Sequence, residues 1–480
     1  MKIYIGIDVG TTSLKALALG ERGECLATAK SAYELSACGA EATQNANDWY
    51  EAAIGAIREI AEKVKDLGEI CAISVSAQGG ATVLLDGSGK TITPAYSWMD
   101  NRATRESEEL KNTFGDELFY SRCGWRMQPN ADAAKLLWMK KNISEIYESA
   151  ASFPSTLGFI NQRLTGNIVE DPTCAAIRRL YDINEKKMSG DLLDHLGLAE
   201  DKLPETLPTG VLVGNLTAEA AEQTGLCESV RVYNGAHDQY CASIGSGTVE
   251  AGQLLLATGT AWVLFGVTET PLFGKSRISP CIHPAGGYGA LSTVSGIGAA
   301  FEWLSKLTNT PIPELSAGAE ARKGKNDTLF FRPSATGTGL LIGQSVGAHI
   351  TGLTIGHDKC DLALALMEGA AFETALNIEE YKKSGMSAPA SITMAGGATA
   401  SRFWQSLIAD VTGLDVYAST QTDSPALGAA ILAAASDSGE DISAVARRTS
   451  ASSRKVSPSE LYEYYQTKFN AYKEWRKSHP

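Results

Sequence analysis

An aspartate near the N-terminus stands just before a turn rich in glycine and hydroxyl groups. Asp8 closes an alternating apolar stretch, the turn Gly10-Thr11-Thr12-Ser13 follows, and a second apolar stretch resumes around Lys15. Backbone N–H groups and hydroxyls in such a turn can bind phosphate oxygens, and the Asp8 carboxylate can hold Mg²⁺ directly or through water. Taken alone, the stretch fits an ordinary hairpin equally well, because short glycine motifs often arise by chance.

The second half of the chain repeats this pattern. An apolar stretch leads into the turn Thr258-Gly259-Thr260, and another apolar stretch follows. Two such hairpins, one in each half, predict a duplicated fold with two phosphate-binding loops facing one cleft. This arrangement resembles the actin-like ATPase superfamily, whose members grip nucleotide phosphates between two hairpins. We therefore expect an α/β fold of two actin-like (ribonuclease H-like) ATPase domains with an interdomain cleft.

Asp238 is the candidate catalytic residue. It lies in the segment Gly235-Ala236-His237-Asp238-Gln239, after a short apolar strand and before a run of small residues typical of a helix start. A carboxylate at a strand end faces the ligand crevice of an α/β fold, where it can accept the proton of a hydroxyl that attacks phosphorus. A helix N-cap is the simpler interpretation of the same aspartate, and the two roles are compatible. We expect His237 to be structural.

The elements that must position these residues alternate between strands and helices. Residues 70–76 predict a buried strand, with 82–85 as its partner across the turn at 78–80. Residues 48–51 resemble a capping box that starts an amphipathic helix, and residues 133–141 predict another helix.

The middle of the chain contains the predicted domain boundary. Residues 185–229 are polar and predict helices around a proline-bearing turn, and residues 230–234 predict a strand. The boundary is placed before that strand, which gives an N-terminal domain of residues 1–229 and a C-terminal domain of residues 230–480.

The C-terminal domain contains four further predicted elements. Residues 361–383 predict a long amphipathic helix, 390–395 a strand that ends at two glycines, and 425–435 a small-residue helix suited to close packing. The aromatic and charged stretch 457–475 predicts a helix on the surface or against a partner.

Composition narrows the class of protein. The 480 residues carry 42 Lys and Arg against 55 Asp and Glu, a net charge of −13, which argues against nucleic acid or an anionic membrane as a partner. Nine cysteines are scattered without a CxxC pair, so neither a zinc site nor a disulfide framework is indicated. The chain shows neither a signal peptide nor an apolar run long enough to cross a bilayer, and we expect a cytoplasmic protein.

The chain resembles the FGGY carbohydrate kinases over nearly its whole length. Asp8-Val9-Gly10-Thr11 and Thr258-Gly259-Thr260 resemble the two phosphate loops of that family, and residues 235–239 resemble the segment that supplies its catalytic aspartate. Residues 348–353, followed after seven residues by 361–368, fit the family's C-terminal signature. The resemblance implies phosphorylation of a sugar hydroxyl by ATP and Mg²⁺, with an N-terminal sugar-binding domain and a C-terminal ATP-binding domain.

The resemblance also implies which residues contact nucleotide and metal. Asp8 would hold the metal, and Asp238 would act as the base. Gly396-Gly397-Ala398 with Ser401 resembles the family's adenine-side loop. The remaining implied nucleotide contacts belong to the two phosphate loops: Gly10, Thr11, Thr12, Ser13, Lys15, Thr258, Gly259 and Thr260.

On the sugar side, Trp98-Met99-Asp100-Asn101-Arg102 resembles the family's Trp-x-Asp-x-Arg element. Asp100 would take substrate hydroxyls, while Arg102 would hold the loop or the acceptor; a surface Asp–Arg pair is the alternative. Trp98 fits either a core position or a position against the sugar's apolar face. The other implied substrate contacts are Gln78, Gly79, Asp238 and Gln239.

Several departures from the family pattern leave the sugar open. Gln78-Gly79-Gly80-Ala81 lacks the histidine that xylulose kinases carry there, and Asp132 stands where Pro, Ser or Thr is usual in the N-terminal signature. Residues 336–340 replace the family's Gly-Glu-Arg-Thr-Pro segment. A pentulose such as xylulose or ribulose is our first expectation, and another polyol or sugar acid is the alternative.

Two other functional classes compete with a kinase. An ATP-switched chaperone needs a β-rich peptide-binding module, for which the helical tail leaves no room. A catalytically silent homologue that acts as a regulator stays open because the sugar-side segments are altered. A homodimer is expected only because two-fold assemblies are common.

Overall fold

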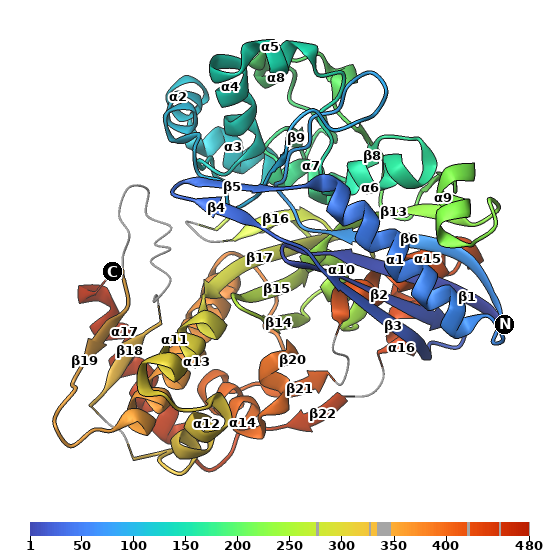
Figure 1. The fold of residues 1–480 in the computed structure, drawn as a ribbon. Coiled ribbons are helices and arrows are strands. Elements are labelled where there is room, and N and C mark those ends of the chain that lie inside the picture. The colour runs from blue at the N-terminus through green and yellow to red at the C-terminus, as the bar shows by residue number, and fades with distance from the viewer. Residues whose placement is uncertain (275–277, 326–327, 334–346, 420–422, 451–452, 480) are drawn as a thin grey trace.

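The computed structural model describes residues 1–274, 278–325, 328–333, 347–419, 423–450 and 453–479. Within these residues, one sheet of six strands and one of seven form two bodies, and a group of helices lies above the first sheet (Figure 1). This is the predicted α/β arrangement of two sheet-centred units.

The first sheet has the order β12-β13-β6-β1-β2-β3. β1 and β2 pair antiparallel with Asp8 opposite Lys15, so the first predicted hairpin is confirmed. β6 runs parallel between β1 and β13, so both of its edges are already paired. The predicted pairing of 70–76 with 82–85 is therefore wrong, and Thr82 forms a bridge with Tyr96 instead. The strands are β1 (Lys2–Val9), β2 (Ser13–Gly20), β3 (Cys25–Ala32), β6 (Glu69–Ala77), β12 (Leu212–Asn215) and β13 (Arg231–His237).

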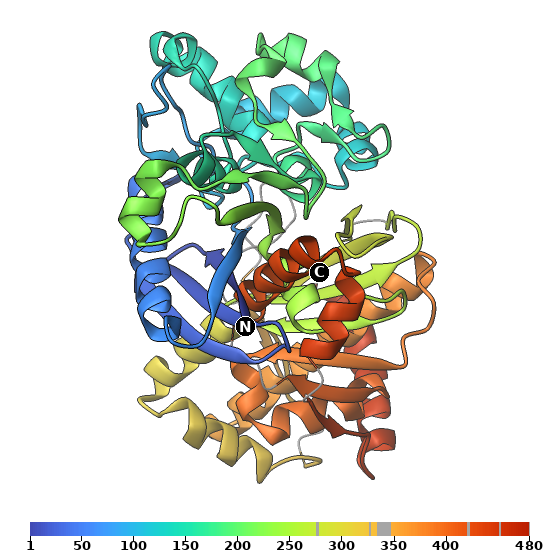
Figure 2. The ribbon, with the colours of Figure 1, turned by 90° about the vertical axis from the view of Figure 1, so that its right-hand side faces the viewer.

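Alternation along β1 sends its side chains to two different layers. Ile3, Ile5 and Ile7 pack in one apolar cluster with helices α1 (Ala46–Val64) and α6 (Thr156–Thr165). Tyr4 belongs to the opposite cluster, with α10 (Asp238–Gly245) and α15 (Ser424–Ser438). Figure 2 shows α15 in red between the blue strands and the lower body.

Close approach of β1 to α15 depends on a glycine. A Cβ on Gly6 would lie 1.9 Å from the carbonyl oxygen of Ala426, so a larger residue would separate the strand from the helix. The small-residue helix predicted at 425–435 is confirmed, and small side chains let it cross this sheet.

Helix α1 begins earlier than predicted. Asn45 is the N-cap, and its side chain accepts a hydrogen bond from the Asn47 backbone N–H, so the capping box at 48–51 is wrong. Asp48 lies inside the first turn of the helix. It is not the capping residue, but its negative charge complements the helix dipole.

The second sheet has the order β16-β17-β15-β14-β20-β21-β22. β14 pairs antiparallel with β15 across Gly259, so the second predicted hairpin is confirmed. β20 runs parallel to β14 and ends at Gly396, as the sequence predicted. The strands are β14 (Leu254–Thr258), β15 (Trp262–Thr268), β16 (Ser279–Ile282), β17 (Tyr288–Ser295), β20 (Ser391–Gly396), β21 (Asp415–Ser419) and β22 (Ser453–Val456).

Helices of the lower body pack around this sheet (Figure 1). The long predicted helix is α13, and the tail helix is α17, whose Tyr465, Phe469 and Tyr472 are buried in the same apolar cluster as α13. The tail therefore packs against its own chain. The helices are α11 (Ile297–Thr308), α12 (Ile312–Glu320), α13 (Lys359–Lys383), η2 (Gly397–Ala400), α14 (Arg402–Thr412), α16 (Ile442–Thr449) and α17 (Tyr462–Ser478).

The group of helices above the first sheet contains the predicted helix at 133–141, which is α4. Residues 185–229 are less helical than predicted, because strands interrupt them. The remaining elements are α2 (Thr104–Phe114), α3 (Asp116–Cys123), α4 (Asp132–Asn142), α5 (Ser144–Ser149), α7 (Pro172–Ile177), α8 (Gly190–Leu196), η1 (Glu200–Lys202), α9 (Ala218–Thr224), β4 (Ser36–Cys38), β5 (Glu41–Gln44), β7 (Ala95–Tyr96), β8 (Val169–Glu170), β9 (Tyr181–Asp182), β10 (Lys187–Met188), β11 (Glu205–Thr206), β18 (Phe330–Arg332) and β19 (His349–Thr351).

Two elements bear on the domain boundary predicted at 229/230. β13 lies in the first sheet, and α15 covers the same sheet although it comes from the far end of the chain. The boundary itself stays a prediction. In the described part of the chain, every helix is too short or too polar to cross a membrane.

Candidate active site

Asp8 ends β1 on the face that α10 and α15 cover. Its carboxylate is 8% exposed, and the Ser76 hydroxyl donates a hydrogen bond of 2.8 Å to its Oδ1. Burial, and then the negative charge of nearby Asp238, raise the pKa of Asp8 to about 7. The two predicted acidic residues thus lie within electrostatic reach of one another.

The turn that follows Asp8 is held from outside the hairpin. The Tyr33 hydroxyl donates to the Gly10 carbonyl oxygen at 2.6 Å, and the Gln44 amide donates to the Thr11 carbonyl oxygen at 2.7 Å. Thr12 remains exposed, and Ser13 is partly exposed. The hydroxyls of Thr12 and Ser13 are therefore accessible at a loop that is held in place, which suits phosphate binding.

Asp238 is the first residue of α10, and His237 occupies the N-cap position. The interpretation of Asp238 as an N-cap is therefore wrong. Its Oδ1 is buried and accepts no hydrogen bond within the described residues, although Nε2 of His237 is 3.3 Å away. Oε1 of neighbouring Gln239 is likewise buried without a hydrogen bond in that part of the chain. Two consecutive residues at the start of α10 therefore each have a buried oxygen with unused acceptor capacity.

Gln78 and Gly79 lie between the first hairpin and the start of α10. The Gln78 backbone N–H donates to the Val9 carbonyl oxygen at 2.9 Å, while its Oε1 is a further buried acceptor without a partner among the described residues. A Cβ on Gly79 would lie 2.4 Å from Cδ2 of His237. The structure thus brings these two predicted sugar contacts close to Asp238.

Trp98 connects the predicted sugar loop to the first phosphate loop. Its side chain is 41% exposed, and its Nε1–H donates to Oγ1 of Thr11 at 2.9 Å. The indole is therefore not a core residue, and one of its edges stays accessible.

Asp100 and Arg102 form a buried pair rather than a surface pair. Asp100 is fully buried, and its carboxylate accepts from Nε of Arg102 at 2.9 and 3.0 Å and from Nη2 at 2.7 Å. The Ala42 backbone N–H adds a bond of 2.8 Å. Because both oxygens are used, the pair stabilises the loop that carries Trp98.

The second phosphate loop has a different internal arrangement. The Thr258 hydroxyl donates to the Ala395 carbonyl oxygen at 2.7 Å and accepts from the Ala398 N–H at 3.1 Å, so it fastens the hairpin to the β20 turn. Gly259 and Thr260 are both exposed. The loop therefore offers its turn, and not the buried Thr258, to a phosphate.

The predicted adenine-side loop continues from the same turn. Gly396 has a φ of 96°, a conformation that favours glycine, and Gly397 and Ala398 belong to the short helix η2. Ser401 is the N-cap of α14, and its hydroxyl accepts from the Trp404 N–H at 3.4 Å. Backbone groups of this loop can approach a ligand because two of its residues lack side chains.

Lys15 has a partner that the sequence did not reveal. Its Nζ lies 2.7 Å from Oδ1 of Asp423, the residue before α15. The pair ties the first hairpin to the start of that helix. Asp-Ser-Pro is a typical helix start and predicts a structural aspartate, but nothing in the sequence places it beside Lys15.

Four other residues of the site carried no recognisable signal. Ser76, Tyr33 and Gln44 hold Asp8 and its turn, as described above. Asn130 donates to the Trp98 carbonyl oxygen at 3.0 Å, and its Oδ1 is buried without a partner in the described chain. A polar residue at the end of a predicted buried strand is a sign of a site residue, and among these four that sign was present in the sequence for Ser76. The altered segment 336–340 lies outside the described residues.

Comparison with known proteins places the chain in a family. A model described as the FGGY family of carbohydrate kinases, N-terminal domain, matches residues 3–245, and the corresponding C-terminal domain model matches residues 254–436. The chain is 28% identical over 444 residues to a xylulose kinase of Bacillus subtilis (strain 168), covering 90% of this chain and 88% of that protein.

Solved structures show the same fold. A crystal structure described as a xyloylose kinase from Brucella ovis superposes with a TM-score of 0.91 and 25% identity, over 99% of each chain. A gluconate kinase from Lactobacillus acidophilus gives a TM-score of 0.88 at 24% identity, covering 99% of this chain and 98% of that one. These likenesses confirm the predicted two-domain actin-like architecture.

Proposed function

The chain belongs to the FGGY family of carbohydrate kinases and is therefore a sugar phosphotransferase that uses ATP; we propose that its acceptor is a terminal hydroxyl of a ketose, first of all a pentulose such as xylulose or ribulose. The observation that carries the proposal is the buried Oδ1 of Asp238, which accepts no hydrogen bond from the described residues and lies 3.3 Å from Nε2 of His237, close to Gly79 and to the buried Asp8.

Asp238 is the proposed base. Its free oxygen accepts the hydroxyl proton while that hydroxyl oxygen attacks the terminal phosphorus of ATP in line with the leaving oxygen. His237 packs against Gly79 and contacts Asp238, and this arrangement fixes the direction in which the carboxylate points. Gln239 and Gln78 each contribute a buried acceptor that suits the remaining sugar hydroxyls.

The two hairpin turns are the proposed phosphate sites. Thr12 is exposed in the first turn, residues 10–13, and Gly259 and Thr260 are exposed in the second. The N-terminus of α11 lies against this second turn, where the Ala299 N–H donates to the Thr260 carbonyl oxygen at 3.3 Å. A helix N-terminus adds partial positive charge there, which favours phosphate. The 396–401 loop is the proposed adenine side.

The residues present suit Mg²⁺. In such sites, Mg²⁺ is usually held by one or two carboxylates together with substrate phosphates and water, so a single buried carboxylate with one oxygen left over is an adequate donor. Asp8 has that oxygen, since Ser76 bonds only to Oδ1, and Asp238 is its acidic neighbour. When bound there, the ion would neutralise charge on the transferred phosphoryl group. Asp8 is thus the proposed metal ligand.

The choice of pentulose rests on the curated xylulose kinase that is 28% identical over most of both chains. Against xylulose itself stands the Gly-Gly-Ala sequence after Gln78, which removes a histidine side chain from the sugar side. A few hydroxyl contacts decide selectivity in such pockets. A different polyol or a sugar acid is therefore the alternative substrate class.

Sugar-dependent ADP release tests the proposal. The panel contains xylulose, ribulose, fuculose, rhamnulose, sedoheptulose, erythritol, gluconate and glycerol, each with ATP and Mg²⁺ and with wild type or Asp238→Asn. Turnover with a pentulose that the variant loses supports both substrate class and base. Turnover only with gluconate or glycerol moves the substrate to the alternative class, and ATP binding without any turnover favours a silent regulatory homologue.

Three further proposals concern the whole molecule. We propose residues 1–229 as the sugar-binding part and 230–480 as the ATP-binding part, which limited proteolysis with each ligand can map. A homodimer and a cytoplasmic location also stay proposals; light scattering decides the first and fractionation of the producing cell the second.

A further inference from the structure

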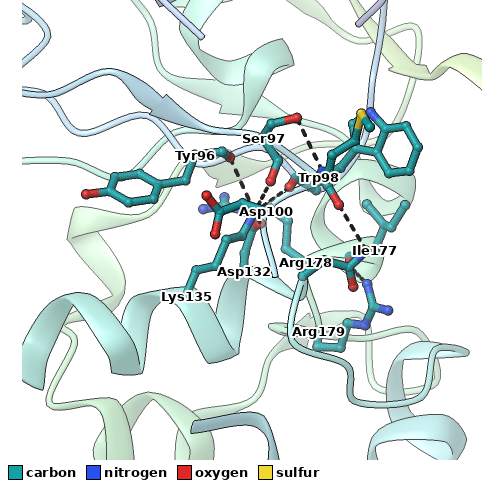
Figure 3. A network of polar contacts seen from close by, with 12 residues as sticks. Tyr96, Ser97, Trp98, Asp100, Asp132, Lys135, Ile177, Arg178 and Arg179 are labelled. Atoms are coloured by element: carbon teal, nitrogen blue, oxygen red, sulfur yellow. Dashed lines mark hydrogen bonds and ion pairs between the residues drawn. The ribbon is translucent and has the colours of Figure 1, made fainter. Parts of the chain in front are cut away.

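Four charged side chains form a fully buried network next to the proposed sugar side, and Figure 3 labels three of them, Asp132, Lys135 and Arg178. Asp132 and Lys135 come from α4, Glu170 from β8, and Arg178 from the residue that ends α7. All four side chains are 0% exposed. Two positive and two negative charges balance, which lets the network exist away from water.

Lys135 connects this network to two separate segments of backbone. Its Nζ donates to the carbonyl oxygens of Gly80 at 2.7 Å, Ser97 at 3.0 Å and Tyr96 at 3.3 Å. Figure 3 shows the side chain rising from α4 toward these carbonyl groups. One segment continues from Gln78 and Gly79, and the other leads directly into Trp98. A single ammonium group therefore spans both segments that carry the proposed sugar contacts.

Asp132 supplies the charge that keeps Lys135 in place. Its Oδ1 lies 2.9 Å from Nζ of Lys135, and its Oδ2 accepts from Nε of Arg178 at 2.8 Å. Burial acts to raise the pKa of Asp132, but the charges of Lys135 and Arg178 outweigh it and lower that pKa. The carboxylate is therefore ionised. Pro, Ser or Thr, the residues usual at this place in the family signature, would lack this charge.

Arg178 completes the balance from the far side. Its Nη1 donates to Glu170 at 3.0 and 3.2 Å, and its Nη2 donates to the Phe153 carbonyl oxygen at 2.7 Å. The Arg178 carbonyl oxygen accepts from the Ala133 N–H at 3.1 Å, which ties the end of α7 to the start of α4. Each of the four charged groups thus has at least one partner of opposite charge within 3.0 Å.

We propose that Lys135, held by Asp132 and Arg178, is a positioning residue for sugar binding: it fixes the segments 78–80 and 96–98 relative to one another. The inference rests on the proposed function in naming the sugar as the ligand that those segments contact. Lys135 acts through backbone carbonyl groups and does not itself touch the substrate.

The test compares two double variants that each remove one buried ion pair. Asp132→Asn/Lys135→Met removes the positioning pair and leaves Arg178 with Glu170. The matched control, Glu368→Gln/Lys468→Met, removes a buried pair of 2.6 Å between α13 and α17, far along the chain from the sugar segments. Both variants lose one buried pair, so general destabilisation is shared.

Two readouts are measured on both variants. Displacement of the sugar contacts weakens sugar binding, so the sugar KM of the first variant should rise by about tenfold or more. Its ATP KM should change by less than about twofold, because the nucleotide contacts are not displaced. Hydrogen exchange of the amides in 78–82 and 96–101 should accelerate in that variant and not in the control. Equal effects of both variants on sugar KM and on exchange would overturn the proposal.

The exchange measurement needs no turnover, so it separates this inference from the proposed function. If wild type phosphorylates none of the sugars, local exchange still decides whether Lys135 fixes the two segments. If the first double variant fails to fold, Asp132→Ser takes its place. Accelerated exchange confined to the two segments in Asp132→Ser supports the inference, and unchanged exchange there overturns it.

Discussion

Nε1 of Trp98 donates a hydrogen bond of 2.9 Å to Oγ1 of Thr11. The donor lies in the loop proposed to bind sugar, and the acceptor lies in the turn proposed to bind phosphate. This bond joins the two loops directly. The contact is exposed to solvent, so water competes for both groups and the free energy that the hydrogen bond contributes is small.

Trp98→Phe should weaken the mutual dependence of sugar and nucleotide binding. Loss of this bond costs about 1 kcal/mol of coupling, so the ratio of sugar Kd values without and with a non-hydrolysable ATP analogue should fall about fivefold. Calorimetric titration measures both Kd values. Trp303→Phe is the matched control, because Trp303 is 43% exposed and lies on α11. A double-mutant cycle with Thr11→Val tests the bond directly. If the effects of Trp98→Phe and Thr11→Val on the ratio of Kd values simply add, the bond does not carry the coupling.

Asp238→Asn should abolish most turnover while the protein keeps binding ATP. The amide cannot take the hydroxyl proton, and general-base catalysis contributes about 10²- to 10⁴-fold, so kcat should fall within that range. The sugar KM should change much less. Stopped-flow and steady-state ADP release measure both constants. Unchanged kcat in a correctly folded variant would remove Asp238 as the base.

Asp8 should make the unliganded protein less stable as the pH rises. Burial and then the charge of Asp238 raise its pKa from 3.8 to about 7 in the folded state. Folding then favours the protonated carboxyl: this contribution is fully present below about pH 4 and is lost as pH rises through about 7. Asp8→Asn removes the titration.

The stability gain of Asp8→Asn over wild type should therefore grow with pH. Between about pH 5 and about pH 8 the difference in free energy of unfolding should increase by about 2 kcal/mol, measured by urea denaturation without nucleotide or Mg²⁺. Ser13→Ala serves as the control, since it alters the same hairpin without a titrating group. A pH-independent difference would show that Asp8 stays ionised throughout.

Gly79→Ala should impair catalysis by displacing His237. The added Cβ would lie 2.4 Å from Cδ2 of His237 and 2.8 Å from Cδ1 of Ile177, so the imidazole must move away from Asp238. A shift of about 1 Å at such a site lowers rates about 10²-fold, which kcat/KM for the sugar measures. Gly87→Ala is the control, because a Cβ there meets open space. ATP affinity should be unaffected in both variants.

Asp100→Ala should destabilise the fold strongly. Removing Asp100 leaves the buried guanidinium of Arg102 with only the exposed Glu41 carboxylate at 3.6 Å, and breaking such a buried pair costs about 3–5 kcal/mol, detectable by chemical denaturation. Glu250→Ala provides the comparison: it breaks the Glu250–Arg447 pair of 2.6 Å, whose side chains are half-exposed, and should cost less than about 1 kcal/mol. If Asp100→Ala is nearly as stable as wild type but loses sugar affinity, the carboxylate serves the substrate instead.

Local pattern was sufficient to predict both hairpins and the long helices, because each is written in consecutive residues. Alternation around Asp8 and Thr258 revealed the strands, and the start of α13 was predicted to within two residues. Neighbours that come from distant parts of the chain were not predictable. The sequence predicts that residues 82–85 pair with β6, because they follow it directly. In the structure, β1 and β13 occupy the two edges of β6.

The same distinction separates the parts of the site. Asp8, Asp238 and Trp98 belong to recognisable short segments, and the structure brings all three to one region. The partners of site residues do not lie in recognisable short segments. Asp423 pairs with Lys15 although about four hundred residues separate them, and the Thr258 hydroxyl donates a hydrogen bond to the Ala395 carbonyl oxygen. The sequence predicts that Asp100 takes substrate hydroxyls, with a surface Asp–Arg pair as the alternative, because nothing there indicates that Arg102 and the Ala42 N–H enclose it.

The covering of β1 by α15 has a consequence for how the protein is made. The first strand leaves the ribosome early, but the helix that fits against Gly6 is translated only near the end of synthesis. Until then one apolar face of the nascent sheet is bare and exposed to association with other chains. A ribosome-bound fragment that stops before residue 424 should therefore engage chaperones, and one that extends past residue 438 should be released from them.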